Sequence, residues 1–336
     1  MPSPIRCDVD FTKPGKQLGH LFIPYSHNLG GWANLMVPIC TIGNGTGPTA
    51  LVLAGNHGDE YPGQVAVMKL LRELKMEDVS GRLILIPTLT MPGAKAATRL
   101  SPLDGKNFNR SFPGNPAGTV SEILAHYLTT VLFPLADLVI DIHTGGRSVD
   151  FVPCAHMHLV PAGPQRQAML AGTEAWNSEF CFLYADIAGT GLLPVEAENQ
   201  GKIVVTTEMG GSENVTAQVH HLTQSGLRNV LTHSGVLKGR VVPRPAPARW
   251  VQALHVDDYR FAPESGVYEN VVPLGEAVTA GQTVGRIHFL ERPDREPLEV
   301  KALSAGILIA TRAPSIVGQG DCVACIAHEV DPRTLP

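Results

Sequence analysis

Three separate stretches of the sequence end an apolar run with a residue that can bind a metal or move a proton. The first, Leu51 to Ala54, leads to His57 and Glu60, and the others end at His143 and Glu208. Neutral imidazole and carboxylate groups both suit Zn²⁺. The three stretches together therefore predict one metal site with one base beside it.

The apolar runs predict buried strands, and the segments between them show apolar residues at helical spacing. This alternation favours an α/β fold with a mostly parallel sheet flanked by helices. Ligands of such sheets bind outside the carboxyl ends of the strands. We expect the last helix to bend at Gly226. The expected strands are 49–54, 82–89, 138–142 and 201–207, and the expected helices are 64–74, 120–133, 165–176 and 217–231.

Glycines follow each of the candidate residues, at Gly58, at 145–146 and at 210–211. Glycine at such places lets the backbone approach a ligand closely. A single histidine at a strand end is more often a capping or core-edge residue. The coincidence of three such ends favours the metal site over that reading.

Four ordered motifs carry a resemblance to a known family. They read G-N-H-G-D-E at 55–60, N-R-S-F-P-G at 109–114, D-I-H-T-G-G at 141–146 and T-E-M-G-G at 207–211. The pattern resembles the succinylglutamate desuccinylase/aspartoacylase family, a branch of the zinc carboxypeptidase-like hydrolases. The run 101–114, with the opening Pro4-Ile5 and Ile23-Pro24-Tyr25-Ser26, is similar within that family to the N-acetyl-diaminobutyrate deacetylases of ectoine breakdown.

His57, Glu60 and His143 would supply three protein ligands to one Zn²⁺ per chain. Three ligands leave a fourth position open, which is typical of catalytic rather than structural zinc. The resemblance implies that Glu208 is the general base, which takes a proton from the attacking water and returns it to the leaving amine. Asp141, two residues before His143, would orient that ligand or make a simple turn contact.

The long segment 90–118 has weak periodicity, and loops of this length are usually functional or disordered. By resemblance, Arg99 polarises the scissile carbonyl, although a solvated loop arginine is the alternative. Asn109 and Arg110 would bind the substrate carboxylate through a planar, bidentate fork. Asn107 adds a polar contact or only stabilises the loop. Four further histidines are expected at the surface or core edge, namely His156, His158, His220 and His221.

Composition excludes several classes of protein. The chain has 336 residues, 44% hydrophobic and 17% charged, and a net charge of −5 without a basic cluster. The sequence therefore lacks the basic patch that nucleic-acid binding requires, and no apolar stretch reaches the length of a membrane span. The first ten residues lack the long apolar region of a secretory signal. Six scattered cysteines favour a reducing cytoplasm, and the pair Cys322 and Cys325 is read as part of a strand without a redox or metal role.

Changes in composition and in expected secondary structure divide the chain into three parts. We expect an N-terminal β segment at 1–46, a zinc hydrolase catalytic domain at 47–240, and a smaller C-terminal β domain at 250–332 after a proline-rich linker. The last part resembles half of a lipoyl-type barrel-sandwich. Its single lysine, Lys301, lacks the expected methionine partner. A structural β lid beside the active site is therefore favoured over a carrier function.

These features lead to one function and several alternatives. The expected activity is a zinc-dependent deacetylase acting on a small N-acetylated amino acid, with N-acetyl-2,4-diaminobutyrate giving diaminobutyrate and acetate. Desuccinylation, aspartoacylase-like cleavage or carboxypeptidase activity is the alternative among enzymes. A non-catalytic ligand-binding protein is the alternative outside them, but such a protein needs no Glu208. The expected partner is a small-molecule substrate, and a homo-oligomer stays open.

Overall fold

The apolar run Thr49–Ala54 forms strand β4, in which all six residues are buried. Leu51 and Leu53 belong to one hydrophobic cluster, while Ala50 and Val52 belong to a second. Successive side chains of a strand point to opposite faces. A strand covered on both faces is therefore apolar throughout, which is why the sequence shows a continuous run rather than alternation.

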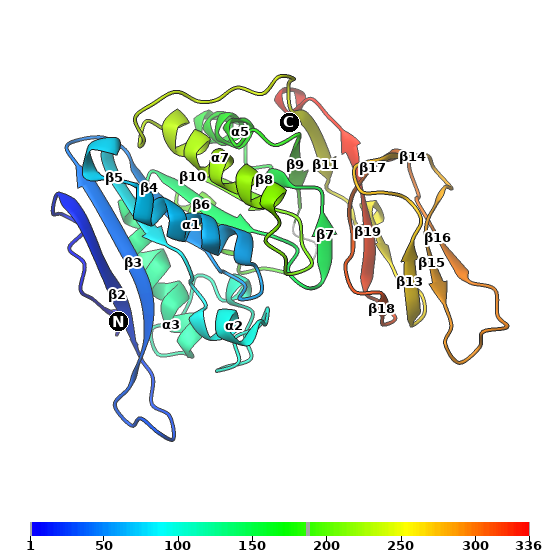
Figure 1. Ribbon diagram of the computed structural model, residues 1–336, viewed down its shortest axis with the longest axis horizontal. Helices are drawn as coiled ribbons and strands as arrows, with labels where there is room; N and C mark the ends of the chain where they lie inside the picture. The colour runs from blue at the N-terminus through cyan, green and yellow to red at the C-terminus, as the bar shows by residue number, and fades with distance from the viewer. Residues whose placement is uncertain (1, 186–188, 336) are drawn as a thin grey trace.

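The computed structural model describes residues 2–185 and 189–335 (Figure 1). Within these ranges the strands are β1 Arg6–Cys7, β2 Gly15–Pro24, β3 Asn34–Asn44, β4 Thr49–Ala54, β5 Gly81–Ile86, β6 Leu138–His143, β7 Val149–Phe151, β8 Cys154–His158, β9 Phe180–Tyr184, β10 Ile203–Glu208, β11 Arg249–Ala253, β12 Tyr259–Phe261, β13 Gly266–Asn270, β14 Ala277–Val278, β15 Thr283–His288, β16 Leu298–Lys301, β17 Gly306–Arg312, β18 Ile316–Val317 and β19 Cys322–Glu329.

The strands of the described residues form one 15-stranded sheet and one 4-stranded sheet. The large sheet runs β1-β2-β3-β5-β4-β6-β10-β8-β9-β11-β19-β17-β14, with β12 and β7 paired to β19 and β17. Pairing is parallel in β5-β4-β6-β10 and in β8-β9-β11. The expected mixed α/β sheet is confirmed. Parallel pairing is confined to these two blocks, because the blocks meet at the antiparallel pair β10–β8 and the strands added at both ends of the sheet are also antiparallel.

Helices cover both faces of the central strands (Figure 1). The second hydrophobic cluster joins α1 and α7 to one face, and the first joins α3 and α6 to the other. At the start of α3 the backbone N–H of Thr119 donates to Glu122 Oε2 at 2.8 Å, which satisfies one donor at the helix N-terminus. No helix of the described residues is both long and apolar enough to cross a membrane. The α-helices are α1 Tyr61–Glu73, α2 Met91–Ala96, α3 Val120–Tyr127, α4 Phe133–Leu135, α5 Pro164–Ala175, α6 Leu193–Asn199 and α7 Ala217–His233.

One expected helix is confirmed, and two other local predictions were wrong. The expected helix 120–133 is helical throughout and contains a π-helical turn at Leu128–Leu132 between α3 and α4. The segment 90–118 is not structureless, since it holds α2 and a 3₁₀ turn at Phe108–Arg110. Helix α7 runs through Gly226 without interruption. A Cβ at Gly226 would meet the indole of Trp176, so this glycine serves helix packing rather than a bend.

The chain after residue 250 contributes to both sheets. Strand β11 pairs with β9 on one side and with β19 on the other, so the C-terminal strands continue the large sheet. The small sheet, in the order β16-β15-β13-β18, packs a separate cluster around Val284 and Ile287. The chain therefore returns from this small sheet to place β17 and β19 beside the central strands (Figure 1).

Candidate active site

The ends of β4, β6 and β10 bring together the candidate metal ligands and the candidate base, namely His57, Glu60, His143 and Glu208. These strands are neighbours in the sheet, and Glu208 lies opposite His143 in the β10–β6 register. Gly55 adopts a positive φ of 64° and turns the chain from β4 into the loop that carries His57. Glu60 directly precedes α1, where the positive end of the helix dipole favours a carboxylate.

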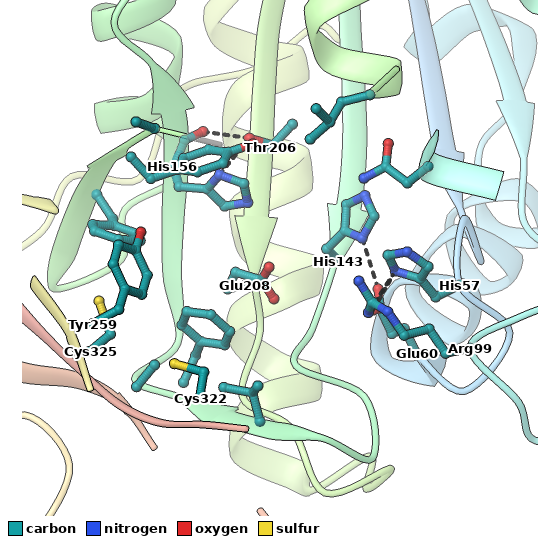
Figure 2. Close-up of a pocket in the computed structure, with 18 of the residues that line it drawn as sticks. His57, Glu60, Arg99, His143, His156, Thr206, Glu208, Tyr259, Cys322 and Cys325 are labelled. Carbon is teal, nitrogen blue, oxygen red and sulfur yellow. Dashed lines mark hydrogen bonds and ion pairs between the residues drawn. The ribbon is translucent and has the colours of Figure 1, made fainter. Parts of the chain in front are cut away.

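The two imidazoles converge on one carboxylate. Glu60 Oε1 lies 2.7 Å from His57 Nδ1, and Glu60 Oε2 lies 2.9 Å from His143 Nδ1 (Figure 2). Ligand atoms from the three residues all lie within 4.8 Å of one another, and all three side chains are buried. Two nitrogen donors and one carboxylate oxygen at this spacing form a group that could hold a metal ion.

Hydrogen bonds behind the imidazoles fix which nitrogen of each ring faces this centre. The Asn107 side-chain oxygen already accepts from the backbone N–H of Asn109, so it acts as an acceptor 3.0 Å from His57 Nε2. Asp141 Oδ2 is likewise an acceptor, 2.8 Å from His143 Nε2. Both Nε2 atoms therefore carry a proton, and both Nδ1 atoms can offer a lone pair to a metal. The donor set thus fits a divalent cation.

The same contacts shift the ionisation of the cluster. Burial alone would raise the pKa of Glu60, but the imidazoles of His57 and His143 outweigh it and hold this pKa below its usual value. Burial also disfavours the charged form of His143, yet Asp141 and Glu60 raise its pKa well above 6.5. The Glu60 carboxylate is therefore ionised at neutral pH, which is the form that binds a cation. A metal that binds His143 Nδ1 must displace the proton that the raised pKa of His143 holds on the ring.

Glu208 has a different environment from Glu60. Its Oε2 atom is buried and has no hydrogen-bond partner among the described residues. Burial, with a smaller contribution from the negative charge of Glu60, raises the pKa of Glu208 to about 8. Two carboxyl groups of one site thus differ widely in proton affinity. Such a separation is the usual basis for giving one group an electrostatic role and the other a proton-transfer role.

Arg99 reaches the same centre from the loop that follows α2. Its Nη1 lies 3.4 Å from Glu60 Oε1 and 3.3 Å from His57 Nδ1. The side chain is 40% exposed, so the guanidinium stands at the boundary between the metal-binding residues and open space. It is therefore placed to meet a substrate oxygen that approaches the metal-binding residues.

Of the three residues expected to bind substrate, two line the cavity and one does not. Arg110 and Asn109 line the cavity beside the metal-binding residues. Asn109 also accepts the backbone N–H of Leu193 at 2.8 Å, which ties its loop to the start of α6. Asn107 is instead engaged by His57 and does not line the cavity. Its contact favours a role in orienting His57 over direct substrate binding.

The cavity has a volume of about 230 Å³. This is at or below the lower end of the range for drug-sized ligands, so the cavity suits a small molecule. The metal-binding residues form one wall. The opposite wall comes from C-terminal strands and includes Tyr259 of β12 and Cys322 and Cys325 of β19 (Figure 2). The two cysteines are free thiols and line the cavity, a position that the sequence pattern does not reveal.

The prediction for His156 was wrong. Its side chain is only 5% exposed, and it lines the cavity together with Thr206 and Phe182. The other three histidines lie outside the cavity lining. The alternation Cys154-Ala155-His156-Met157-His158 predicts a strand, but residues 154 and 158 share the face of His156 and lie outside the cavity lining, so this pattern alone does not single out His156.

Three glycines near the site have no room for a side chain. A Cβ at Gly58 would meet the backbone of Gly93, and Cβ atoms at Gly145 or Gly211 would meet the carbonyl oxygen of Val149. These glycines therefore let neighbouring loops approach each other closely. They help to set the positions of His57, His143 and Glu208 through backbone packing, and the expected approach of the backbone to a ligand stays a prediction.

This chain belongs to the succinylglutamate desuccinylase/aspartoacylase family, whose catalytic-domain model matches residues 46–234. That range contains the metal-binding residues, Arg99, Arg110 and Glu208.

Individual relatives extend the similarity to the whole chain. The N-alpha-acetyl-L-2,4-diaminobutyric acid deacetylase of Halomonas elongata is 38% identical over 330 residues, which are 98% of this chain and 96% of that protein. The product-bound structure of the ectoine utilization protein EutE (DoeB) from Ruegeria pomeroyi has a TM-score of 0.94 and 36% identity, covering 98% of this chain and 100% of that one. A succinylglutamate desuccinylase/aspartoacylase structure from Rhodobacter sphaeroides has a TM-score of 0.93 and 38% identity with the same coverage.

Proposed function

We propose that this chain is a zinc-dependent amidohydrolase that removes the acetyl group from N-acetyl-2,4-diaminobutyrate, giving diaminobutyrate and acetate. The observation that carries the proposal is the convergence of His57 Nδ1, His143 Nδ1 and the Glu60 carboxylate beside Glu208. Family membership and the deacetylase named in Halomonas elongata support the choice of reaction. In that relative the acetyl group is named on the α-nitrogen, and we adopt the same position here.

His57, Glu60 and His143 would hold the zinc ion. When bound, zinc polarises a carbonyl and lowers the pKa of water, so that hydrolysis proceeds near neutral pH. Asn107 and Asp141 keep the two imidazoles in the tautomer and orientation that this binding needs. The metal centre therefore depends on five residues, of which only three are ligands.

Glu208 is the proton carrier in this proposal. It lies in register with His143 and has an oxygen without a partner among the described residues. A carboxylate in this position can take a proton from the attacking water and deliver it to the leaving nitrogen. Its high proton affinity in the folded protein suits both halves of that transfer.

Two arginines orient the substrate. Arg99 stands beside Glu60 and can donate to the carbonyl oxygen as negative charge develops there. Arg110 lines the cavity and offers a planar guanidinium to the α-carboxylate. A carboxylate held at one point fixes the amide at a set distance from the metal-binding residues, so binding energy is converted into orientation.

Our proposal extends to the fold and setting of the enzyme. We assign a zinc-carboxypeptidase-like catalytic domain to 47–240, with the β segment 1–46 before it and a β domain at 250–332 that closes the cavity. Free cysteines at all six positions support a reducing, cytoplasmic location. The net charge of −5 supports a small-molecule substrate rather than nucleic acid or membrane. Assembly into a homo-oligomer is part of the proposal.

The test compares substrates, metal states and one matched variant. Purified protein is assayed with N-acetyl-2,4-diaminobutyrate, N-acetylaspartate, N-succinylglutamate and a peptide, with and without chelator. We expect preferential release of acetate from the first substrate, loss of activity with chelator and recovery with zinc. Glu208→Gln should keep zinc but lose kcat by about 10²-fold or more. Preference for another acyl amino acid would move the chain to the desuccinylase or aspartoacylase activity, and no hydrolysis at all would indicate a binding protein.

A further inference from the structure

One nitrogen of His156 is buried in the cavity wall without a partner. The His156 side chain is 5% exposed, and its Nε2 atom makes no hydrogen bond within residues 2–185 and 189–335. Buried polar atoms are nearly always hydrogen-bonded, so an exception inside a cavity wall points to a ligand. Figure 2 shows the His156 ring on the same side of the sheet as Glu208.

The hydrogen bonds of Thr206 decide the tautomer of His156. The Thr206 hydroxyl donates to the backbone carbonyl of His156 at 2.7 Å, which uses its only proton. The same oxygen lies 2.9 Å from His156 Nδ1, so it must accept a proton from that nitrogen. His156 Nδ1 therefore carries the hydrogen, and Nε2 presents a lone pair. Burial lowers the pKa of His156 well below 6.5, which keeps the ring neutral.

Two aromatic residues are neighbours of His156. Phe182 lies opposite His156 in the β8–β9 register, and the Tyr184 ring packs edge-on against His156 with centroids 4.7 Å apart. Both aromatic residues line the cavity. A hydrogen-bond acceptor among aromatic faces is a favourable setting for an alkylammonium group, which gains both a charge-assisted hydrogen bond and cation–π attraction.

We propose that His156, with Phe182 and Tyr184, is the subsite for the free ammonium group of the substrate, so that the enzyme selects acylated diamino acids. The inference rests on the proposed deacetylase function and adds the residue that recognises the second amine. His156 Nε2 accepts a hydrogen bond from that ammonium. A neutral acceptor is needed here, because an imidazolium ring would repel the ligand.

The spacing along the sheet agrees with the size of such a substrate. His156 pairs with Thr206, and Thr206 precedes Glu208 by two residues on the same face of β10. His156 and Glu208 are thus diagonal neighbours on adjacent antiparallel strands, and such residues lie about 7–8 Å apart. The path from the amide nitrogen to the terminal nitrogen of an extended diaminobutyrate is about 5 Å, and one hydrogen bond adds about 2.9 Å. A substrate whose amide lies beside Glu208 can therefore reach His156.

The experiment measures a selectivity ratio in the zinc-loaded enzyme. The ratio compares kcat/KM for N-α-acetyl-2,4-diaminobutyrate with that for N-acetylnorvaline, in which a methyl group replaces the ammonium. We expect His156→Leu to lower this ratio by about 10- to 100-fold, mainly through KM for the diamino substrate. His156→Gln keeps an acceptor near the Nε2 position and should restore part of the ratio. The control is His221→Gln, which alters an exposed histidine of α7 outside the cavity lining.

Equal losses on both substrates in His156→Leu, with the ratio unchanged, would overturn the subsite. So would a parent enzyme that cleaves N-acetylnorvaline as well as the diamino substrate, although the deacetylase function would then stand. If the parent cleaves neither substrate, the proposed function fails. The subsite is then judged by calorimetry, which should show that 2,4-diaminobutyrate binds the parent at least 10-fold more tightly than it binds His156→Leu; equal binding would refute it.

A spectroscopic readout tests the tautomer without any turnover. Nitrogen-15 NMR of the histidine rings should show His156 protonated at Nδ1 and unprotonated at Nε2, and the Nε2 signal should shift when 2,4-diaminobutyrate is added. Thr206→Val removes the hydroxyl that fixes this tautomer and should mix the two forms. A parent protein with the proton on His156 Nε2 would contradict the proposal, because that nitrogen could not accept from an ammonium.

Discussion

Replacing Asn107 by leucine removes one oxygen that two buried donors share. That oxygen lies 3.0 Å from His57 Nε2 and 2.9 Å from the backbone nitrogen of Asn109. Without it, His57 loses the acceptor that keeps its proton on Nε2. The ring can then place the proton on Nδ1, the nitrogen that faces Glu60, and a protonated nitrogen cannot bind a metal.

The size of the effect follows from these two hydrogen bonds. Loss of the partner behind a ligand histidine weakens metal affinity by about 10- to 100-fold, or about 1.4–2.7 kcal/mol. Each donor left unsatisfied costs about 1–3 kcal/mol of folding stability. Asn107→Leu should therefore bind zinc more weakly and unfold more easily. Asn107→Asp keeps an acceptor at this position and should retain metal affinity.

The assay is competition for zinc against a chromophoric chelator, followed by kinetics at saturating zinc. We expect weaker zinc binding in Asn107→Leu, with KM for the acylated amino acid close to that of the parent once the metal is bound. Asn115→Ala serves as the control, since it removes a turn contact to Ala117 in the same segment. Unchanged zinc affinity with a raised KM would refute the reasoning and return Asn107 to the set of substrate-binding residues.

Three further predictions follow from the described contacts. In metal-free protein, the pKa of Glu208 is raised from 4.5 to about 8, so its stabilising contribution is complete below pH 4.5 and is lost as the pH rises toward 8. This loss can reach roughly 5 kcal/mol. The Tm of Glu208→Gln relative to the parent should therefore increase between pH 5 and pH 8 in chelator, and a constant difference would contradict the shift. Arg110→Lys should raise KM about 10-fold or more while kcat changes less, since lysine cannot form the planar fork; an unchanged KM would argue against this contact. Gly226→Ala should lose about 1–3 kcal/mol in urea unfolding, because the new Cβ would lie 2.5 Å from the Trp176 ring; a more stable variant would show that the ring can move aside.

The sequence was most informative where local pattern and tertiary role agree. Strands β4, β6 and β10 are apolar because both of their faces are covered, and a polar residue directly after such a run has few positions available other than the sheet edge. The convergence of His57, Glu60 and His143 could be expected for that reason. The order of the strands in the sheet is not encoded locally, so the sequence did not predict it.

The sequence was least informative where a residue acts through a distant contact. Gly226 suggested a bent helix, but the ring of Trp176 occupies the space where its side chain would be. His156 looked like a peripheral histidine, because its partner Thr206 lies 50 positions away. The cysteines of β19 reach the cavity only because β11 joins the C-terminal strands to the large sheet. Contacts of this kind depend on the whole fold, which no local pattern reports.

The wall that β12 and β19 add to the cavity has a consequence for how the protein matures. Domains form while the chain is being synthesised, beginning with its N-terminal part. His57, Glu60, His143 and Glu208 all leave the ribosome before Cys322 and Cys325, which complete the opposite wall. A growing chain can therefore assemble its metal-binding residues and base while the cavity is still open on one side. Discrimination among substrates by the shape of the cavity is the last property that the nascent protein acquires.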